Sequence, residues 1–426
     1  MNARQETAIP APQVRTPTTL VWLLSVCCAI SVANVYYAQP LLDSIGTAFQ
    51  IGQADVGKVI TAIQIGSALA LLLVIPLGDL LNRKRLMITQ LVLLAVALIG
   101  VALASGSVAL YLGMLGAGMF GTAMTQGLIA YAASLASAQE RGRVVGVVQS
   151  GVVIGVLMAR VLAGVITDLA GWQAVYWVSA SLAAGMLLML WRTLPALPVP
   201  TTGMSYGQLL RSMLTLLGTE RTLQVRGMIG FFMFAAFSTF WTALVLPLSA
   251  PPLSMSHGVM GAFGLVGVVG ALAAARAGHW TDQGFGQRTT GLALGCLMLA
   301  WLPIALLHQS IFALIIGIVM LDLGGQAVHV VNQSLILTTR PEASSRLIGC
   351  YMLFYSAGSG LGAMASTWVY AQAGWSGVCL LGFAASALAM AFWLVTRFTK
   401  RSATACHGTR QTRSLAAPAD CNAPAE

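Results

Sequence analysis

Apolar stretches of about 20 residues recur along almost the whole of this 426-residue chain, each long enough for an α-helix to cross the ~30 Å hydrocarbon core of a bilayer. Only 8% of the residues are charged and 58% are hydrophobic, whereas a soluble domain carries about 25% charged residues. A water-soluble fold could not bury so much apolar surface. The chain is therefore predicted to be an all-α integral membrane protein with the bilayer as its solvent.

Twelve such stretches predict twelve transmembrane helices. They lie at residues 18–38, 57–80, 86–104, 107–133, 144–166, 173–191, 227–249, 258–278, 289–307, 311–337, 347–370 and 376–396. With the N-terminus inside, 20 of the 22 Lys and Arg residues fall in the inner segments, which is the charge asymmetry typical of cytoplasmic loops. The exceptions are Lys58, at the outer end of the second span, and Arg160, inside the fifth. We expect a multi-pass membrane protein with both termini in the cytoplasm.

The net charge of +10 thus comes from the Lys and Arg residues of the inner segments, and no nucleic-acid partner is expected. The chain divides into a cytoplasmic N-terminal segment (1–17), a first six-helix bundle (18–191), a cytoplasmic linker (192–226), a second six-helix bundle (227–396) and a polar tail expected to be disordered (397–426). Within the linker, Ser205 to Gly218 has the apolar spacing of an interfacial amphipathic helix. No cleavable signal pattern precedes the first span.

The two bundles are related by an internal repeat. At a fixed offset of 203 residues and without any gap, Asp79 falls on Asp282, Arg85 on Arg288, Arg143 on Arg346, and several glycines fall on glycines. Matches spread over most of a six-span unit indicate a parallel duplication, which is one of the repeat architectures of transporters.

Two stretches at the cytoplasmic ends of spans resemble a known signature. Residues 78–85, Gly-Asp-Leu-Leu-Asn-Arg-Lys-Arg, are similar to the major facilitator motif Asp-Arg-x-Gly-Arg-Arg, with Leu80 and Asn82 replacing the usual Arg and Gly, and residues 278–288 look like its second copy. Residues 33–42 and 140–172 resemble a bacterial branch grouped with drug/proton antiporters. The resemblance covers residues 18–396. It implies two pseudo-symmetric six-helix bundles around a central substrate cavity.

One position departs from that branch. Arg160 stands where the fifth span of exporters has Pro, and Ala159 stands in place of the preceding Gly. This departure weakens the inference that transport is outward.

The resemblance also implies a conformational latch on the cytoplasmic side. Asp79 would face Arg346 at the start of the eleventh span, and by symmetry Asp282 would face Arg143. A carboxylate is also stabilised by the positive N-terminus of a helix. Arg83, Arg85 and Arg288 belong to the same two signatures. The alternative is that these charges only enforce topology.

Ionisable groups inside the bilayer are costly and are therefore functional candidates. In the tenth span Asp322, Gln326, His329 and Gln333 share one helix face, with Asp322 ~17 Å from the start of the span. Burial in a closed cavity would favour the protonated form of Asp322, so that it could take up a proton on one side and release it on the other. The alternatives are a static ion pair between Asp322 and Arg160, and a His329 that is merely wetted at the cytoplasmic mouth.

The first span supplies candidate substrate-cavity residues: Asn34, Tyr36, Tyr37 and Gln39. The two tyrosines could equally belong to the aromatic belt of an outer membrane interface. Weaker cavity candidates are Gln64, Gln126, Gln149 and Trp241, because a buried amide can be satisfied by a neighbouring helix without any ligand.

These features predict proton-coupled export of drug-like or amphipathic molecules by alternating access. The alternatives are proton-coupled uptake of a small metabolite and a membrane sensor that does not transport. The expected partners are a small-molecule substrate, protons and the lipid bilayer, and the protein is expected to be a monomer. No cofactor, metal site or enzymatic activity is expected. The substrate itself is not predicted, because one such fold carries many substrates.

Overall fold

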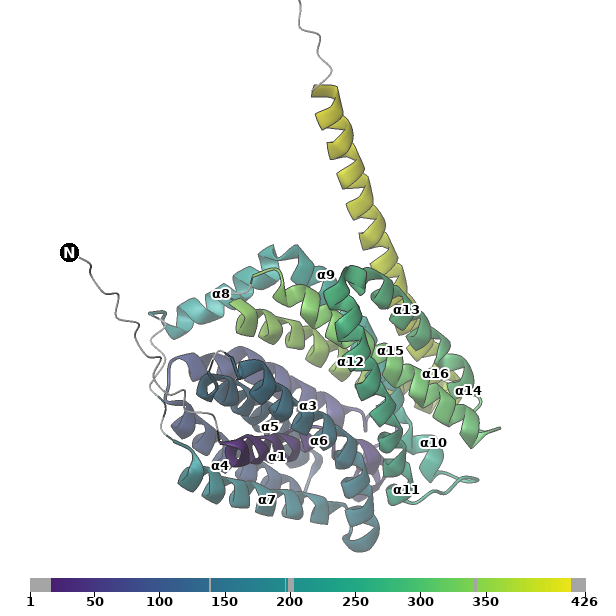
Figure 1. Ribbon diagram of the computed structural model, residues 1–426. Helices are drawn as coiled ribbons and strands as arrows, with labels where there is room; N and C mark the ends of the chain where they lie inside the picture. Colours follow the sequence, from purple (N-terminus) through teal and green to yellow (C-terminus); the bar gives the residue numbers. More distant parts are fainter. Residues whose placement is uncertain (1–16, 138, 196, 198–202, 341–342, 415–426) are drawn as a thin grey trace, which may run out of the picture.

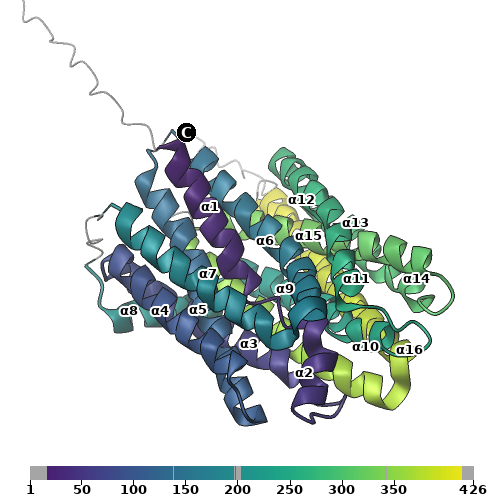
Figure 2. The ribbon, with the colours of Figure 1, turned by 90° about the horizontal axis from the view of Figure 1, so that it is seen from below.

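The computed structural model describes residues 17–137, 139–195, 197, 203–340 and 343–414. Within these residues the chain is built from α-helices joined by short 3-10 and π segments, and it contains no strand. Figures 1 and 2 show one helical bundle in which α8 lies at one end and α10 and α11 lie toward the other. We refer to these as the α8 end and the α11 end.

The first half comprises α1 to α7. Their bounds are α1 (Thr18–Ala33), the 3-10 helix η1 (Gln39–Leu41), α2 (Leu42–Ala48), α3 (Lys58–Leu69), the π and 3-10 segments η2 (Ala70–Val74) and η3 (Ile75–Asp79), α4 (Arg83–Ala102), α5 (Ser107–Leu135), α6 (Arg141–Ala170) and α7 (Trp172–Thr193). Pro76 lies at the beginning of η3. A proline cannot donate the backbone hydrogen bond that an α-helix needs, which accounts for the change of helix type.

The second half comprises α9 to α16. Their bounds are α9 (Arg221–Ala243), α10 (Val245–Ser249), α11 (His257–Ala262), η4 (Phe263–Gly267), α12 (Val268–Trp280), η5 (Thr281–Phe285), α13 (Gly286–Leu299), α14 (Trp301–Ala305), α15 (Ile311–Leu337) and α16 (Ser344–Ser414). Between the halves, α8 (Tyr206–Thr219) is the helix predicted within the linker. Its start is fixed by a capping box, in which Ser205 and Gln208 each bond the other's backbone N–H.

The predicted twelve crossings agree with the helices. Nine helical runs in the described residues are long and apolar enough to cross a membrane. Two of them, His257–Ala305 and Ser344–Arg397, are 49 and 54 residues long, whereas one crossing needs about 20 residues. Each is interrupted by one glycine of positive φ, Gly284 (85°) or Gly374 (60°), and so supplies two crossings. The remaining crossing begins with the shorter apolar helix Thr18–Ala33.

Large apolar side chains cover much of the outer surface of the bundle. Leu112, Leu292, Phe312 and Leu380 are each exposed by 65% to 72%. Exposed apolar patches of this extent are unusual on a soluble monomer, and here they suit contact with lipid.

The last helix runs beyond the last predicted span. α16 continues past the bundle to Ser414 (Figure 1), where the sequence predicted a disordered segment from residue 397. Residues 397–414 contain no proline and several good helix formers, so nothing in them stops the helix. The predicted segment 1–17, apart from Pro17, and the last part of the tail, 415–426, lie outside the described residues.

The two halves come into backbone contact at the α11 end. A Cβ on Gly57, the residue that precedes α3, would overlap the carbonyl oxygen of Ala363 in α16. A Cβ on Gly261 of α11 would likewise overlap the carbonyl oxygen of Arg160 in α6. Glycine at these positions therefore lets helices from opposite halves approach to backbone contact.

Candidate functional site

Arg160 is buried in the middle of the bundle. It lies on α6 and exposes only 3% of its surface. Its Nε donates a hydrogen bond to Gln39 Oε1 at 3.0 Å, and its guanidinium lies 3.9 Å from the ring centroid of Trp241 and 5.5 Å from that of Tyr36. Its Nη2 has no hydrogen-bond acceptor among the described residues. These surroundings hold the guanidinium in place by neutral groups and aromatic faces.

Asp322 is the buried carboxylate that faces this arginine. It lies on α15, in the other half, and exposes 3% of its surface. The two side chains attract each other electrostatically, and Trp241 lies beside the carboxylate as well. No guanidinium nitrogen of Arg160 lies within 4.0 Å of a carboxylate oxygen of Asp322 in the described structure. The direct ion pair between Asp322 and Arg160 that the sequence offered as an alternative is therefore absent in this state.

A run of glycines packs against both charges, and we refer to Arg160, Asp322 and these glycines together as the charged layer. A Cβ on Gly264 would stand 3.2 Å from Arg160 Cδ, and a Cβ on Gly267 would stand 2.8 Å from Asp322 Oδ2. Gly270 makes a similar approach to Asp322 Cβ at 3.0 Å. These glycines recur every third residue through η4 and the start of α12, so they share one helix face. Sequence reasoning missed this run, although its regular spacing was visible.

Tyr36 joins the two halves beside the charges. Its hydroxyl lies 2.7 Å from that of Tyr355 on α16, and Phe234 packs edge-on against the Tyr355 ring at 4.1 Å. Tyr36 therefore lies inside the bundle and not in an interfacial belt. Tyr355 was not predicted, because a lone tyrosine in an apolar span carries no local signal of its role.

The other candidates from the first span pack within the first half. Asn34 accepts a hydrogen bond from Ser179 at 2.6 Å and donates to the carbonyl oxygen of Ile30. Tyr37 is buried and interacts with Ser179 as well. The structure thus brings Tyr36 and Gln39 to the buried charges, and places Asn34 and Tyr37 beside Ser179 of α7.

The polar stripe of α15 continues away from Asp322. His329 Nδ1 lies 3.1 Å from the Tyr351 hydroxyl, and Gln333 Nε2 lies 3.2 Å from His329 Nε2. The ring of Phe234 meets His329 edge-on. His329 is seven residues, or ~10 Å, along the helix from Asp322 and has partners of its own.

The remaining glutamine side chains differ in how deeply they are buried. Gln64 is buried beside Gly360 of α16, and its Oε1 has no donor among the described residues. Gln126 and Gln326 are half-buried, whereas Gln149 is exposed. Of this group, Gln64 lies closest to the charged layer, because it also interacts with Tyr355.

The predicted latch residues lie at the α8 end with other partners. Asp79 pairs with Arg83 at 3.3 Å, and Arg143 pairs with Glu140 at 3.5 Å. The pairs Asp79–Arg346 and Asp282–Arg143 are absent from the ion pairs of the described residues, although Asp79 and Arg346 line one small cleft together with Met213 of α8.

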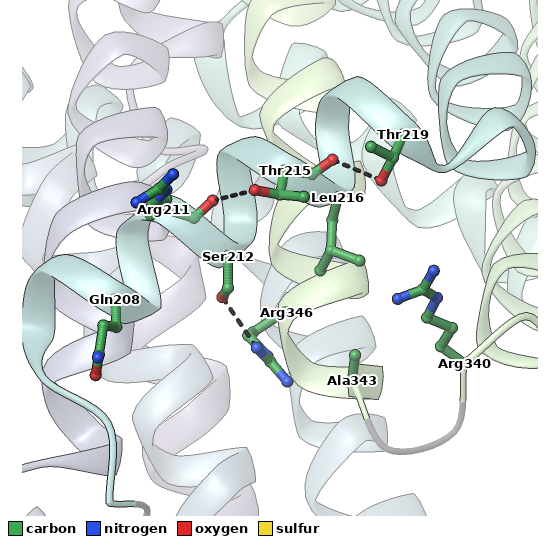
Figure 3. A pocket seen from close by; sticks show the side chains of 9 residues that line it. All are labelled: Gln208, Arg211, Ser212, Thr215, Leu216, Thr219, Arg340, Ala343 and Arg346. Atoms are coloured by element: carbon green, nitrogen blue, oxygen red, sulfur yellow. Dashed lines mark hydrogen bonds between the residues drawn. The ribbon is translucent and has the colours of Figure 1, made fainter.

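Arg346 instead bonds to α8. Its Nη1 donates to Ser212 Oγ at 2.9 Å, as Figure 3 shows. Both residues line a cavity of about 470 Å³ together with Arg211 and Arg340, and Arg340 pairs with Glu220 at 2.7 Å.

The remaining residues of the two signatures also have local partners. Arg288, from the second copy of the signature, has its guanidinium 5.6 Å from the ring centroid of Phe285. Asn82 caps α4 by accepting a hydrogen bond from the backbone N–H of Arg85.

At the α11 end a histidine connects the halves. His257, the first residue of α11, has its Nε2 3.1 Å from Asp43 Oδ1 and 2.9 Å from Ser44 Oγ, and its Nδ1 3.2 Å from Asp168 Oδ1. Asp168 also accepts the backbone N–H groups of His257 and Gly258. This cluster joins α2 and α6 to α11. Sequence reasoning missed it because its members come from three separate segments.

Comparison with known proteins agrees with this architecture. A family model described as Major Facilitator Superfamily matches residues 21–286 and again residues 227–417. The chain belongs to the major facilitator superfamily. It is 40% identical over 382 residues to a putative uncharacterized transporter, YgaY, of Escherichia coli K12, covering 90% of this chain and 96% of that protein. It is 30% identical over 411 residues to a probable transporter of Streptomyces coelicolor, covering 93% and 90%.

Solved structures share the fold at low sequence identity. A bacterial homologue of the lysosomal transporter Spinster, in an inward-facing and occupied conformation, gives a TM-score of 0.73 at 15% identity, covering 89% of this chain and 97% of that one. The POT family transporter PepTSo gives a TM-score of 0.73 at 12% identity, covering 91% of this chain and 98% of that one. As a member of the major facilitator superfamily, the protein is a membrane-embedded, non-enzymatic transporter of a small molecule and has the twelve-helix fold of the superfamily.

Proposed function

We propose that this protein is a proton-coupled secondary transporter that works by alternating access, and that Asp322 carries the proton. The observation that carries the proposal is that Asp322 of the second half and Arg160 of the first are both buried against the same run of glycines. We further propose that it works as a monomer in a bacterial inner membrane, with the α8 end and both termini in the cytoplasm, as the distribution of Lys and Arg indicates.

Electrostatics supports a coupling role for this pair. Leaving one charge of a buried pair uncompensated costs about 3–5 kcal/mol. Because Arg160 and Asp322 stand on opposite halves, any rocking of the halves changes their separation. A change in separation alters how strongly Arg160 stabilises the charged form of Asp322. Conformation and proton occupancy of Asp322 are therefore linked.

The contacts between the halves support alternating access. At the α11 end Thr61 Oγ1 donates to the Gly360 carbonyl oxygen at 2.8 Å, and His257 joins Asp43 and Asp168. At the α8 end Asp79 and Arg346 have partners other than each other. We propose that this is the state closed toward the outside, and that the pairs Asp79–Arg346 and Asp282–Arg143 form when the α8 end closes.

The direction of coupling depends on how the substrate meets Asp322. Export in exchange for protons, as the resemblance to drug/proton antiporters implies, needs a substrate that competes with the proton at Asp322. Uptake together with a proton needs a substrate that binds when Asp322 is protonated. The fixed positive charge of Arg160 beside the site is the specific observation that favours this second mode, because it repels a cationic substrate.

Reconstituted protein tests the carrier assignment. Proteoliposomes containing a pH-sensitive dye are given cationic dyes, amino acids, sugars or monocarboxylates, and proton movement is recorded for wild type, Asp322→Asn and Asp55→Asn. Asp55 is an exposed carboxylate paired with Lys58 at the α11 end and serves as the matched control. We expect substrate-dependent proton movement in wild type and Asp55→Asn, and its loss in Asp322→Asn. Equal proton movement in all three proteins would refute Asp322 as the carrier.

A further inference from the structure

Arg160 is a buried cation whose immediate contacts are all neutral. Gln39 accepts from its Nε, and Trp241 and Tyr36 supply ring faces. Its Nη2 is buried without an acceptor in the part of the chain that the structure describes. An arginine side chain stays protonated in proteins, so this site keeps its positive charge and a free hydrogen-bond donor.

The charged layer is electrically neutral in two states. With Asp322 ionised, the pair Asp322–Arg160 has a net charge of zero. With Asp322 protonated, Arg160 is left as an uncompensated buried cation, which is strongly unfavourable in a low-dielectric interior. One added negative charge next to Arg160 restores neutrality. A proton on Asp322 and an anion on Arg160 therefore favour each other's binding.

We propose that the guanidinium of Arg160 binds the carboxylate of a small organic monoanion, which is the transported substrate and binds together with the proton on Asp322. This inference rests on the proposed function, since it uses Asp322 as the proton carrier. Carboxylate is the group that a guanidinium fork matches best, because two parallel N–H donors meet two oxygens. The orphaned Nη2 supplies one donor for such a fork.

The walls of the layer indicate the rest of the substrate. Trp241 and Tyr36 lie against the guanidinium, and Phe237 lies 6.2 Å from Trp241, centroid to centroid. These rings suit an apolar or aromatic body attached to the carboxylate. A dianion would leave the loaded layer with an excess negative charge, and a cation would meet Arg160, so both are disfavoured.

Ligand-dependent thermal stability of the purified protein tests this proposal. Phenylacetate, benzoate, lactate and acetate are each compared with the corresponding neutral amide, at a mildly acidic and at a neutral pH. We expect the carboxylates, and not the amides, to raise the Tm of wild type, and more strongly at acidic pH because Asp322 is then protonated. In Asp322→Asn, which mimics the protonated carboxyl, we expect the carboxylates to raise Tm equally at both pH values.

Arg160 variants complete the test. Arg160→Gln should weaken carboxylate binding on the order of 10-fold to 100-fold, as the loss of charge-assisted hydrogen bonds implies, while Arg160→Lys should retain part of it. Because Arg160→Gln could also disturb folding, the pH-independent response of Asp322→Asn is the second, separate requirement. Equal shifts by amides and carboxylates, or no shift by any carboxylate, would refute the anion site.

The outcomes separate the two proposals. If cationic dyes move protons in an Asp322-dependent manner and no carboxylate binds, the proton carrier stands and the anion site is wrong. If carboxylates need Arg160 but their binding keeps the wild-type pH dependence in Asp322→Asn, the joint binding proposed here is wrong and the carrier assignment falls with it.

Discussion

Gly57→Ala should open the α11 end of the molecule. Gly57 stands where α3 meets α16, and its backbone N–H donates to Thr367 Oγ1 at 3.2 Å. A methyl group there would overlap the Ala363 carbonyl oxygen and stand 3.0 Å from its carbonyl carbon. Carbon atoms in ordinary contact are ~3.5–4.0 Å apart. The two helices must therefore separate by roughly 0.5–1 Å to accept the methyl group.

The magnitude follows from the cost of overpacking. Forcing an extra methyl into a packed interface costs about 1–3 kcal/mol. This cost applies only when the α11 end is closed, because α3 and α16 are apart in the opposite state. The ratio of open to closed molecules should then rise about 5-fold to 150-fold, since each 1.4 kcal/mol is a factor of ten.

Cysteine labelling measures this ratio. Gln64 lies on α3 about two turns beyond Gly57 and is buried against Gly360, so Gln64→Cys, in a protein without its native cysteines, reacts with a maleimide only when the helices part. The matched control is Gly52→Ala, because a Cβ on Gly52 meets nothing within 4 Å. Equal labelling rates for Gly57→Ala and Gly52→Ala in nanodiscs would refute the steric reasoning.

Three further predictions use the same Gln64→Cys reporter. His257→Ala removes the side-chain bonds to Asp43 and Ser44, each worth about 1 kcal/mol at this partly exposed site, so labelling should rise about 5-fold or more; an unchanged rate would show that the histidine does not hold the halves together. Gly118→Ala would overlap the Ile63 backbone inside the first half, and should lower Tm by a destabilisation of about 1–3 kcal/mol without changing the rate of labelling. Asp79→Asn removes the proposed latch of the α8 end and should slow labelling, and faster labelling would contradict the latch.

The fold was largely predictable because its signal is local. A bilayer crossing is set by the length of an apolar stretch, which the sequence displays directly. α8 was likewise predictable from the spacing within Ser205 to Gly218, and the structure has it at Tyr206–Thr219. The end of the last helix has no such local signal: the last span is expected to end at residue 396, whereas α16 runs to Ser414, and residues 397–414 contain no proline.

The site was predictable only in part. Arg160 and Asp322 stood out because ionisable groups inside a bilayer are costly, but the sequence does not show which spans pack side by side. Their shared layer depends on Gly264 and Gly267 of a third segment, which is tertiary information. The same holds for Tyr355, whose importance comes from the hydroxyl of Tyr36 at 2.7 Å.

The latch shows a different limit of sequence reasoning. Asp79 and Arg346 line the same cleft but bond to Arg83 and Ser212. The proposed pair requires a closed α8 end, and the sequence does not specify which conformation is populated.

Infrared difference spectroscopy of the protein in lipid tests the central claim most directly, because it detects the protonated carboxyl group without any substrate. On acidification, wild-type protein should gain the carbonyl band of a buried, protonated carboxylic acid. Asp322→Glu should shift this band, and Asp322→Asn should abolish it while Asp55→Asn keeps it. A band that persists unchanged in Asp322→Asn would contradict the account, because the proton would then bind elsewhere.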